Sequence, residues 1–442
     1  MPELNSVEED KSRKEKEQKV RRADNLPIPL LFAITRHTDM GSRRPSVFVS
    51  ASTFPEHWLR RYVMGDCPAV SVWVDSWEHP IRWILRFLES LLRTFGALIF
   101  VNNFWSGILF LVAVFIHNPF STLIGLLGMV TAYFTAMLLC APASRLRNGV
   151  ATFNGFMVAQ FIANVAVPFN GTIWNAWLIF PASFFAAIST VIKAAFHSVL
   201  KDYKLPALNS PFSITTLCFL ASQGSTPSPL FPAGMSPVAQ YNNYTQQHYT
   251  GSLVARGIFF SISNIYGCDN IASVTLAWLA VLLASPLLFT QCILGSCVGT
   301  GIAVVLGVNA QQLASGMWSF NSLLVCGSVG GFFYVWNPII CIVSIFAAAF
   351  ACVMAGTLYH TLGYFNLPFQ ALPLFLTDSI FLLAVGAYRA NWLPRVETVD
   401  IRYPELHWEL YHARKKISNS TATITNSTTD STIKMNDFSH EA

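Results

Sequence analysis

Two short polar stretches, Phe100-Val-Asn-Asn-Phe104 and Gly267-Cys-Asp-Asn-Ile271, interrupt long apolar blocks and lie 167 residues apart. The same offset relates three further pairs of landmarks: Pro119 and Pro286, Gly128 and Gly295, and Phe153-Asn154 and Phe320-Asn321. After a small indel, Leu205-Pro-Ala-Leu-Asn-Ser-Pro211 matches Leu367-Pro-Phe-Gln-Ala-Leu-Pro373 at an offset of 162. Chance is a poor explanation for several pairs that share one offset. We therefore predict that the chain contains two homologous halves.

The composition is typical of a membrane protein. Of 442 residues, 53% are hydrophobic and only 12% are charged, and the mean hydropathy is +0.46. Lipid cannot satisfy backbone amides, so the apolar blocks are predicted to be helical. About ten blocks are long enough to cross a hydrocarbon core of about 30 Å, at approximately 93–116, 120–141, 149–168, 173–197, 210–223, 256–283, 287–308, 317–336, 338–360 and 372–391.

The basic residues indicate the orientation in the membrane. Of 28 Lys and Arg, 15 precede Thr94 and seven follow Tyr388. Basic residues near the ends of spans stay on the cytoplasmic side, so both termini are predicted to be cytoplasmic. The loop 224–252 has no Lys, Arg, Asp or Glu and carries the sequon Asn243-Tyr-Thr, which predicts a glycosylated extracellular loop.

These markers divide the chain into five predicted parts. They are a disordered cytoplasmic N-terminal tail (1–57), a first membrane repeat (58–222), an extracellular loop (223–255), a second membrane repeat (256–392) and a cytoplasmic C-terminal tail (393–442). Five crossings in each half place the second half upside-down relative to the first. Inverted repeats are typical of transport proteins, whose solute path lies near the midplane. A membrane enzyme or scaffold that arose by duplication is the alternative.

At these landmarks the sequence resembles the urea transporter family, from about Trp58 to Tyr411. The resemblance rests on Ile265-Tyr-Gly-Cys-Asp-Asn270, Phe100-Val-Asn-Asn103, Asn118-Pro119, Phe320-Asn-Ser322, the paired Leu-Pro segments 205–212 and 367–374, and Val399-Asp-Ile-Arg-Tyr-Pro-Glu405. It implies two inverted five-helix repeats with re-entrant half-helices and a central pore in each protomer. It also implies a homotrimer in the lipid bilayer, and channel-like conduction without an ion or cofactor.

A pore for a planar amide needs flat apolar walls and a few polar groups. Such a solute sheds water on entry, so side chains must replace its lost hydrogen bonds. The candidates for the walls are Phe100, Phe153 and Phe320, with Met157 and Leu324 one helical turn after the last two. Phe153 and Phe320 match each other across the repeat and match the family's aromatic slot. The alternative for any of these Phe residues is ordinary packing between helices or against lipid.

The polar positions are where the sequence departs from the family. The family's Gln beside each Asn-Asn or Asp-Asn pair is replaced by Ala97 in the first half and by Asn264 in the second. The family's Thr in each Leu-Pro segment is replaced by Asn209 and by Ala371. Asn can still donate and accept hydrogen bonds, whereas Ala cannot. Each lost partner in a dehydrated site costs about 1–3 kcal/mol, enough to change which solute passes.

The other polar residues have structural interpretations. Asp269 is expected to cap a helix start, and lining a vestibule is the alternative for it. Lys193 is expected to reach the membrane surface with its long side chain. Asp378 is an intramembrane acid, which is either functional or paired with a Ser or Thr. Four residues are expected to hold helix breaks through backbone hydrogen bonds: Asn102, Asn103, Asn154 and Asn321. Cys and His spacings give no metal site, and neither a catalytic elbow nor a phosphate loop is present.

The sequence thus predicts facilitative transport of urea or a similar small neutral solute across the plasma membrane. Neither an enzyme activity nor a nucleic-acid partner is expected. A related channel for ammonia, water or short amides is one alternative. An ion-coupled secondary transporter is another, for which Asp269 and Asp378 are the available ionisable groups. A protein with a closed pore and a structural role is the third.

Overall fold

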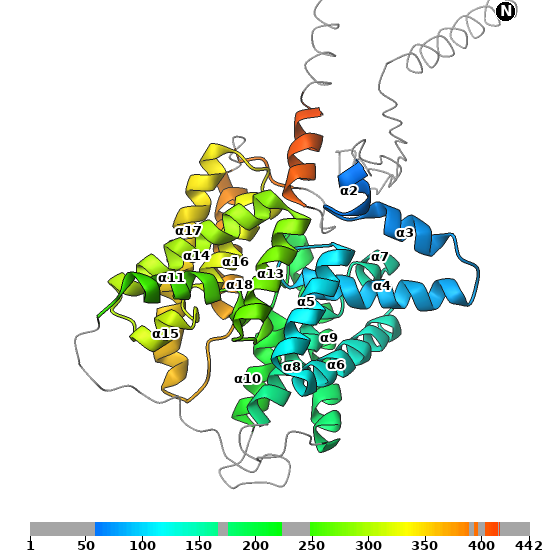
Figure 1. Cartoon of the computed structure of the whole chain (residues 1–442), viewed down its shortest axis with the longest axis horizontal. Coiled ribbons are helices and arrows are strands. Elements are labelled where there is room, and N and C mark those ends of the chain that lie inside the picture. The colour runs from blue at the N-terminus through cyan, green and yellow to red at the C-terminus, as the bar shows by residue number, and fades with distance from the viewer. Residues whose placement is uncertain are drawn as a thin grey trace, which may run out of the picture. The chain divides into compact units, whose positions relative to one another are not determined.

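The computed structural model describes residues 58–166, 176–222, 248–388, 393–396, 403–413 and 415. The predicted tail 1–57 and the sequon at Asn243 lie outside these residues. Apart from one isolated bridge between Tyr334 and Arg395, the described residues form helices, turns and loops (Figure 1). The prediction of an all-α fold is confirmed.

The helices of the first half are α2 (Trp58–Tyr62), α3 (Pro68–Asp75), α4 (Ile81–Ala97), α5 (Phe104–His117), α6 (Pro119–Leu138), α7 (Ala143–Arg147), α8 (Phe153–Ala166), α9 (Ile179–Leu200) and α10 (Ser210–Ala221). Those of the second half are α11 (Gly251–Phe260), α12 (Ser263–Tyr266), α13 (Ile271–Ala284), α14 (Pro286–Val305), α15 (Ala310–Ala314), α16 (Phe320–Gly327), α17 (Pro338–Gly363) and α18 (Leu372–Tyr388). A further helix covers 404–413.

The repeat seen in the sequence extends to the helix bounds. The helices α5, α6, α7 and α8 begin 167 residues before α13, α14, α15 and α16, and α10 begins 162 residues before α18. Backbone conformations repeat as well. Left-handed residues recur in pairs at the same two offsets: Phe100 and Gly267, Cys140 and Gly307, Gly149 and Gly316, Lys204 and Asn366, and Leu208 and Gln370.

Short polar residues explain why the paired helices begin where they do. The side chains of Asn103 and Asn270 accept hydrogen bonds from backbone N–H groups in the first turns of α5 and α13. Those of Asn118 and Ser285 do the same for α6 and α14, and each is followed by a Pro at the first helical position. Such capping satisfies N–H groups that a helix cannot pair internally.

Two of the predicted spans are broken rather than continuous. The block 93–116 is interrupted between Ala97 and Phe104, and the block 256–283 bends by 82° between α12 and α13. The expectation of continuous helices there was wrong, because a left-handed residue ends one helix and an Asn cap starts the next. Within the described residues, four helical segments are long and apolar enough to cross a membrane, and a fifth counts if the bent pair is one span. The remaining apolar helices are only 10–17 residues long.

Glycines permit the closest helix crossings in each half. The helices α6 and α8 pack together, as do α14 and α16. A Cβ added at Gly128 would lie 2.3 Å from the Cβ of Ala159, and one added at Gly295 would lie 2.4 Å from the Cβ of Cys326. The conserved spacing of these two glycines in the repeat therefore reflects one packing requirement that is met twice.

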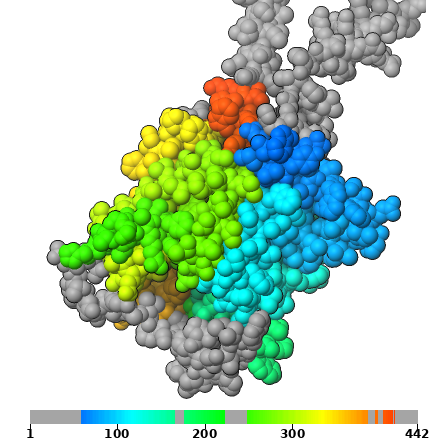
Figure 2. Space-filling view, in the orientation of Figure 1, coloured from blue at the N-terminus to red at the C-terminus, as the bar shows by residue number. Residues whose placement is uncertain are grey.

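The two halves meet along α5 and α13, which pack side by side (Figure 2). The hydroxyl of Ser106 in α5 donates to the backbone oxygen of Ala280 in α13 at 2.7 Å. Buried apolar residues of both halves form one core cluster around this contact.

A buried ionic network ties α3, α4 and α7 together. Glu89 accepts from Arg93 Nε at 2.9 Å and from Arg147 Nε at 3.0 Å, and both Glu89 and Arg93 are at most 2% exposed. Arg147 also donates to Asp75 at 2.8 Å. Burial alone would raise the pKa of Asp75, but hydrogen bonds from Arg147 and Arg86 outweigh it and lower that pKa. The network fixes the segment before α5 against the first half.

The C-terminal helix 404–413 is anchored by Glu405. Its carboxylate accepts from the hydroxyl of Ser285 at 2.7 Å and from the backbone N–H of Leu287 at 2.9 Å. Arg60 of α2 pairs with Glu409 on the same helix. The terminal segments are thus held at the start of α14.

Candidate solute-binding cavity

A cavity of about 210 Å³ lies between the two halves, and we call it the inter-repeat cavity. The first half supplies residues of α8 and of the start of α10, and the second half supplies residues of α12, α16 and the loop before α18. Its walls are formed by Met157, Gln160, Phe161, Asn164, Asn209, Phe212, Asn264, Ile265, Gly267, Met317, Phe320, Leu324, Pro368, Phe369, Gln370 and Ala371.

A wider pocket of about 690 Å³, which we call the vestibule, adjoins it. The two share the lining residues Asn164, Asn264 and Gly267, so they lie next to each other. Asp269 lies in the vestibule with its side chain 88% exposed and 3.2 Å from His117 Nδ1. The expectation that Asp269 caps a helix was wrong, because the neighbouring Asn270 makes that cap.

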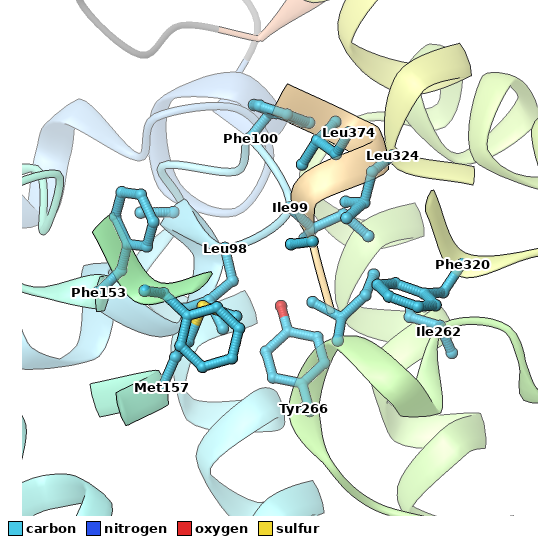
Figure 3. Packing of buried hydrophobic residues seen from close by; sticks show 14 of the residues in the cluster. Leu98, Ile99, Phe100, Phe153, Met157, Ile262, Tyr266, Phe320, Leu324 and Leu374 are labelled. Atoms are coloured by element: carbon cyan, nitrogen blue, oxygen red, sulfur yellow. The ribbon is translucent and has the colours of Figure 1, made fainter. Parts of the chain in front are cut away.

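Six of the nine residues predicted to form the pore line the inter-repeat cavity: Met157, Phe320, Leu324, Asn209, Asn264 and Ala371. Three do not. Phe100 has a left-handed backbone, and its ring packs 4.9 Å from that of Phe332 between the halves. Ala97 is buried at the end of α4. Phe153 lies one turn before Met157 on α8, and in Figure 3 both side chains lie on the side of the core opposite Phe320.

An aromatic wall borders the inter-repeat cavity in the second half. The rings of Phe320 and Phe369 are stacked, with their planes 19° apart and centroids 6.1 Å apart. Met157 and Leu324 contribute further apolar surface to the same cavity. Sequence reasoning missed Phe369, because its repeat partner is Ala207 and the symmetry of the two halves gave no aromatic pair.

Two amide side chains in the wall each have a buried N–H donor without a hydrogen-bond partner among the described residues. Nδ2 of Asn209 and Nε2 of Gln370 are buried and make no hydrogen bond within the described part of the chain. The Oε1 atom of Gln370 is occupied, since it accepts from the hydroxyl of Thr216 at 2.6 Å. An unsatisfied buried donor costs about 1–3 kcal/mol. Both nitrogens are closed off from the cavity space, so a solute carbonyl would relieve that cost once these side chains turn towards it.

Two further amides in the wall are held in place by the backbone. Gln160 Nε2 donates to the oxygen of Tyr266 at 2.9 Å, and Asn264 Nδ2 donates to the oxygen of Ser315 at 2.8 Å. Both bonds use the N–H side of the amide. They fix the orientation of each side chain at the cavity wall.

Two asparagines position the cavity-lining loops in a symmetric manner. Asn154 accepts from the backbone N–H of Phe212 at 3.2 Å and donates to the oxygen of Leu208 at 3.4 Å. Asn321 accepts from the backbone N–H of Leu374 at 3.3 Å and donates to the oxygen of Gln370 at 3.0 Å. The expectation that these residues hold helix breaks together is confirmed, and the bonds place Asn209 and Gln370 at the wall.

Asp378 lines neither the inter-repeat cavity nor the vestibule. It is fully buried in α18 and accepts a hydrogen bond from the hydroxyl of Ser328 at 2.9 Å. A Ser partner was one of the two interpretations expected for this acid. The contact joins α18 to the turn that follows α16.

Comparison with known proteins agrees with this architecture. The family model for the urea transporter matches residues 88–386, which is more than half of the chain. The chain belongs to the urea transporter family. Urea transporter 1 of Ovis aries is 28% identical over 323 residues, covering 73% of this chain and 82% of that protein. Urea transporter 1 of Mus musculus is 29% identical over the same shares. Family membership and the long apolar helices together make this a multi-pass membrane protein.

Proposed function

We propose that this member of the urea transporter family conducts urea, or a similar small neutral solute, by facilitated diffusion through the inter-repeat cavity. The observation that carries the proposal is the wall itself, where unpaired N–H donors of Asn209 and Gln370 lie beside the stacked Phe320 and Phe369. A flat amide fits between apolar faces while its carbonyl accepts from these donors. The names of the relatives from Ovis aries and Mus musculus support urea as the solute.

The proposal includes the setting of the channel. The protein resides in the plasma membrane with both termini cytoplasmic, and its halves have opposite orientations. Three protomers assemble, each with its own pore. The domain division at 1–57, 58–222, 223–255, 256–392 and 393–442 belongs to the same proposal.

One observation favours a second candidate, a channel for ammonia, water or a short amide. Ala371 lines the inter-repeat cavity and offers no hydrogen bond where the family has Thr. An ion-coupled mechanism has less support, because Asp378 lies outside both cavities and Asp269 lies in the wide vestibule. A coupling ion bound there would be separated from a solute in the narrow cavity.

Solute flux in proteoliposomes tests the proposal. Purified protein should speed urea equilibration over protein-free liposomes, in the presence or absence of an Na⁺ or H⁺ gradient. Parallel measurements with ammonia, water and KCl identify the preferred solute. Flux that depends on a gradient would establish coupled transport, and the absence of flux for every solute would establish a closed pore.

Two variants test the role of the amide donors. Asn209→Leu and Gln370→Leu each remove a donor from the wall at similar volume, so urea flux should fall by about tenfold, equivalent to one hydrogen bond of about 1.4 kcal/mol. Gln311→Leu is the matched control, since this exposed amide borders the vestibule, where a solute remains hydrated. If urea flux in Asn209→Leu and Gln370→Leu equalled that of the Gln311→Leu control, neither residue would belong to the pathway.

A further inference from the structure

The wall of the inter-repeat cavity presents amide oxygens as well as amide donors. Gln160 of α8 and Asn264 of α12 line it, one from each half. Gln160 Nε2 donates to the backbone oxygen of Tyr266 at 2.9 Å, and Asn264 Nδ2 donates to that of Ser315 at 2.8 Å. A backbone oxygen can only accept, so each contact fixes the amide nitrogen beside the backbone and turns the amide oxygen away from it.

The protein itself does not use these two amide oxygens. Within the residues that the structure describes, Gln160 Oε1 and Asn264 Oδ1 accept no hydrogen bond. Neither is closed off as Asn209 Nδ2 and Gln370 Nε2 are, so both oxygens retain accessible surface. Gln160 lines the inter-repeat cavity and not the vestibule, so its oxygen is open to the inter-repeat cavity.

The orientation of Gln160 is set before a solute arrives. Its side chain is buried, and its bond to the oxygen of Tyr266 joins the first half to the second. Tyr266 is itself fixed, because its hydroxyl donates to the oxygen of Phe95 at 2.9 Å and its ring stacks on that of Phe110. An acceptor held in this way loses little conformational entropy when a solute binds.

The repeat provides no equivalent of Gln160. At the offset of 167 its counterpart is Gly327, where an added Cβ would lie 3.0 Å from Cys292 Sγ, which leaves little room for a side chain. The counterpart of Asn264 is Ala97, which lies outside the cavity wall. Each half therefore contributes one amide acceptor, at positions that the repeat does not relate.

We propose that Gln160 accepts a hydrogen bond from the solute and, together with Asn264, selects for solutes that have two NH₂ groups. The inference rests on the proposed function and names a residue that determines its specificity. Urea has an NH₂ group on each side of its carbonyl carbon, so one is bound by the first half and the other by the second. A solute with a methyl group in place of one NH₂ leaves one of the two oxygens unpaired in a dehydrated space, which is unfavourable.

Acetamide is the most direct probe, since it matches urea in size and planarity but has a methyl group where urea has its second NH₂. The ratio of urea flux to acetamide flux is measured in proteoliposomes, after subtraction of the flux through protein-free liposomes. The native protein should favour urea. Gln160→Met keeps the length of the side chain and removes the oxygen, so the ratio should fall by about two- to tenfold, the usual worth of one hydrogen bond. Loss of the bond to Tyr266 affects both solutes alike, so the ratio reports the oxygen.

Two further variants complete the test. Gln291→Met is the matched control, because Gln291 is also buried and hydrogen-bonded but lines neither the inter-repeat cavity nor the vestibule. It should leave the ratio at its native value. Asn264→Leu removes the second oxygen from a side chain that is only partly buried, and it should lower the ratio as Gln160→Met does.

Several outcomes would overturn the inference. One is an unchanged ratio in Gln160→Met with urea flux still measurable, and another is an equal fall in Gln291→Met. If Gln160→Met does not fold, an unchanged ratio in Asn264→Leu has the same meaning. Native protein that conducts acetamide as fast as urea would also decide against it, without any variant. Absence of urea flux from the native protein would instead contradict the proposed function, so the two failures are distinguishable.

Discussion

The nine residues predicted to form the pore separate into two groups once their surroundings are known. Ala371 lies in the wall of the inter-repeat cavity, whereas Ala97 is buried at the end of α4 away from it. The resemblance to the family predicts a hydrogen-bonding residue at both positions. The same chemical restoration should therefore have different results at the two positions.

Ala371→Thr should raise urea flux by about two- to tenfold, since one added hydrogen bond is worth about 0.5–1.5 kcal/mol. Ala97→Gln should leave flux unchanged or lower protein stability, because the longer side chain must fit a packed site. Flux of urea and its inhibition by urea analogues are measured for both variants. A rise in urea flux in Ala97→Gln but not in Ala371→Thr would mean that the pathway passes Ala97 and not Ala371.

Phe320 makes a second prediction at this scale. Phe320→Ala removes one face of the aromatic wall, so methylurea flux relative to urea flux should rise by roughly tenfold, the usual discrimination for one carbon in a fitted pocket. Phe180→Ala is the control, because that ring is 68% exposed on α9 and should not affect selection. If both variants showed the same ratio of methylurea flux to urea flux, Phe320 would have only a packing role.

Residue-level inference from the repeat succeeded for one polar pair, whereas Phe153 lies outside the cavity wall that its partner Phe320 lines. Asn154 and Asn321 were found through their shared offset, and their hydrogen bonds are indeed equivalent. Gln370 was missed because its partner in the first half is Leu208, which is apolar.

At the scale of elements, the lengths of the helices were the least predictable property. Apolar blocks of similar length became long helices such as α14 and α17 or broken pairs such as α12 and α13. The difference comes from backbone conformation at Phe100 and Gly267, which a window of hydropathy does not detect. The ionic network that joins α3, α4 and α7 was also unpredictable, since its members are separated by up to 72 residues.

That network should make a large contribution to stability. Glu89→Gln leaves Arg93 and Arg147 without their shared carboxylate, and breaking a buried ion pair costs about 3–5 kcal/mol. Thermal unfolding in detergent should show a marked fall in Tm. Arg86→Gln is the control, because the exposed pair of Arg86 and Asp75 is worth less than about 1 kcal/mol. Similar Tm values for the two variants would mean that the network is dispensable.

At the scale of the whole molecule, the proposed topology makes a prediction that needs no variant of the pore. If both termini are cytoplasmic, glycan should be found on Asn243 and not on Asn419 or Asn426, because only an extracellular sequon is modified. Mass spectrometry before and after glycosidase treatment of intact cells locates it. These three sequons, and a fourth at Asn170, lie outside the described residues. Glycan on the C-terminal pair would reverse the orientation.

The paired left-handed residues suggest stabilising substitutions, because a residue at such a position in one half can be copied to the equivalent position in the other half. Cys140 has φ 55° and is exposed, and its counterpart Gly307 has φ 70° with no atom within 4 Å of an added Cβ. A residue with a side chain costs roughly 1–2 kcal/mol in that conformation, and glycine removes this cost. Glycine also destabilises the fold by about 0.5–1 kcal/mol, because it gives the unfolded chain more conformational entropy, so the net gain is small. Cys140→Gly should therefore raise Tm by a few degrees at unchanged urea flux, whereas an unchanged or lower Tm would show that Cys140 is unstrained. Copying residues from one half to the other in this way would yield a more thermostable preparation for biophysical work.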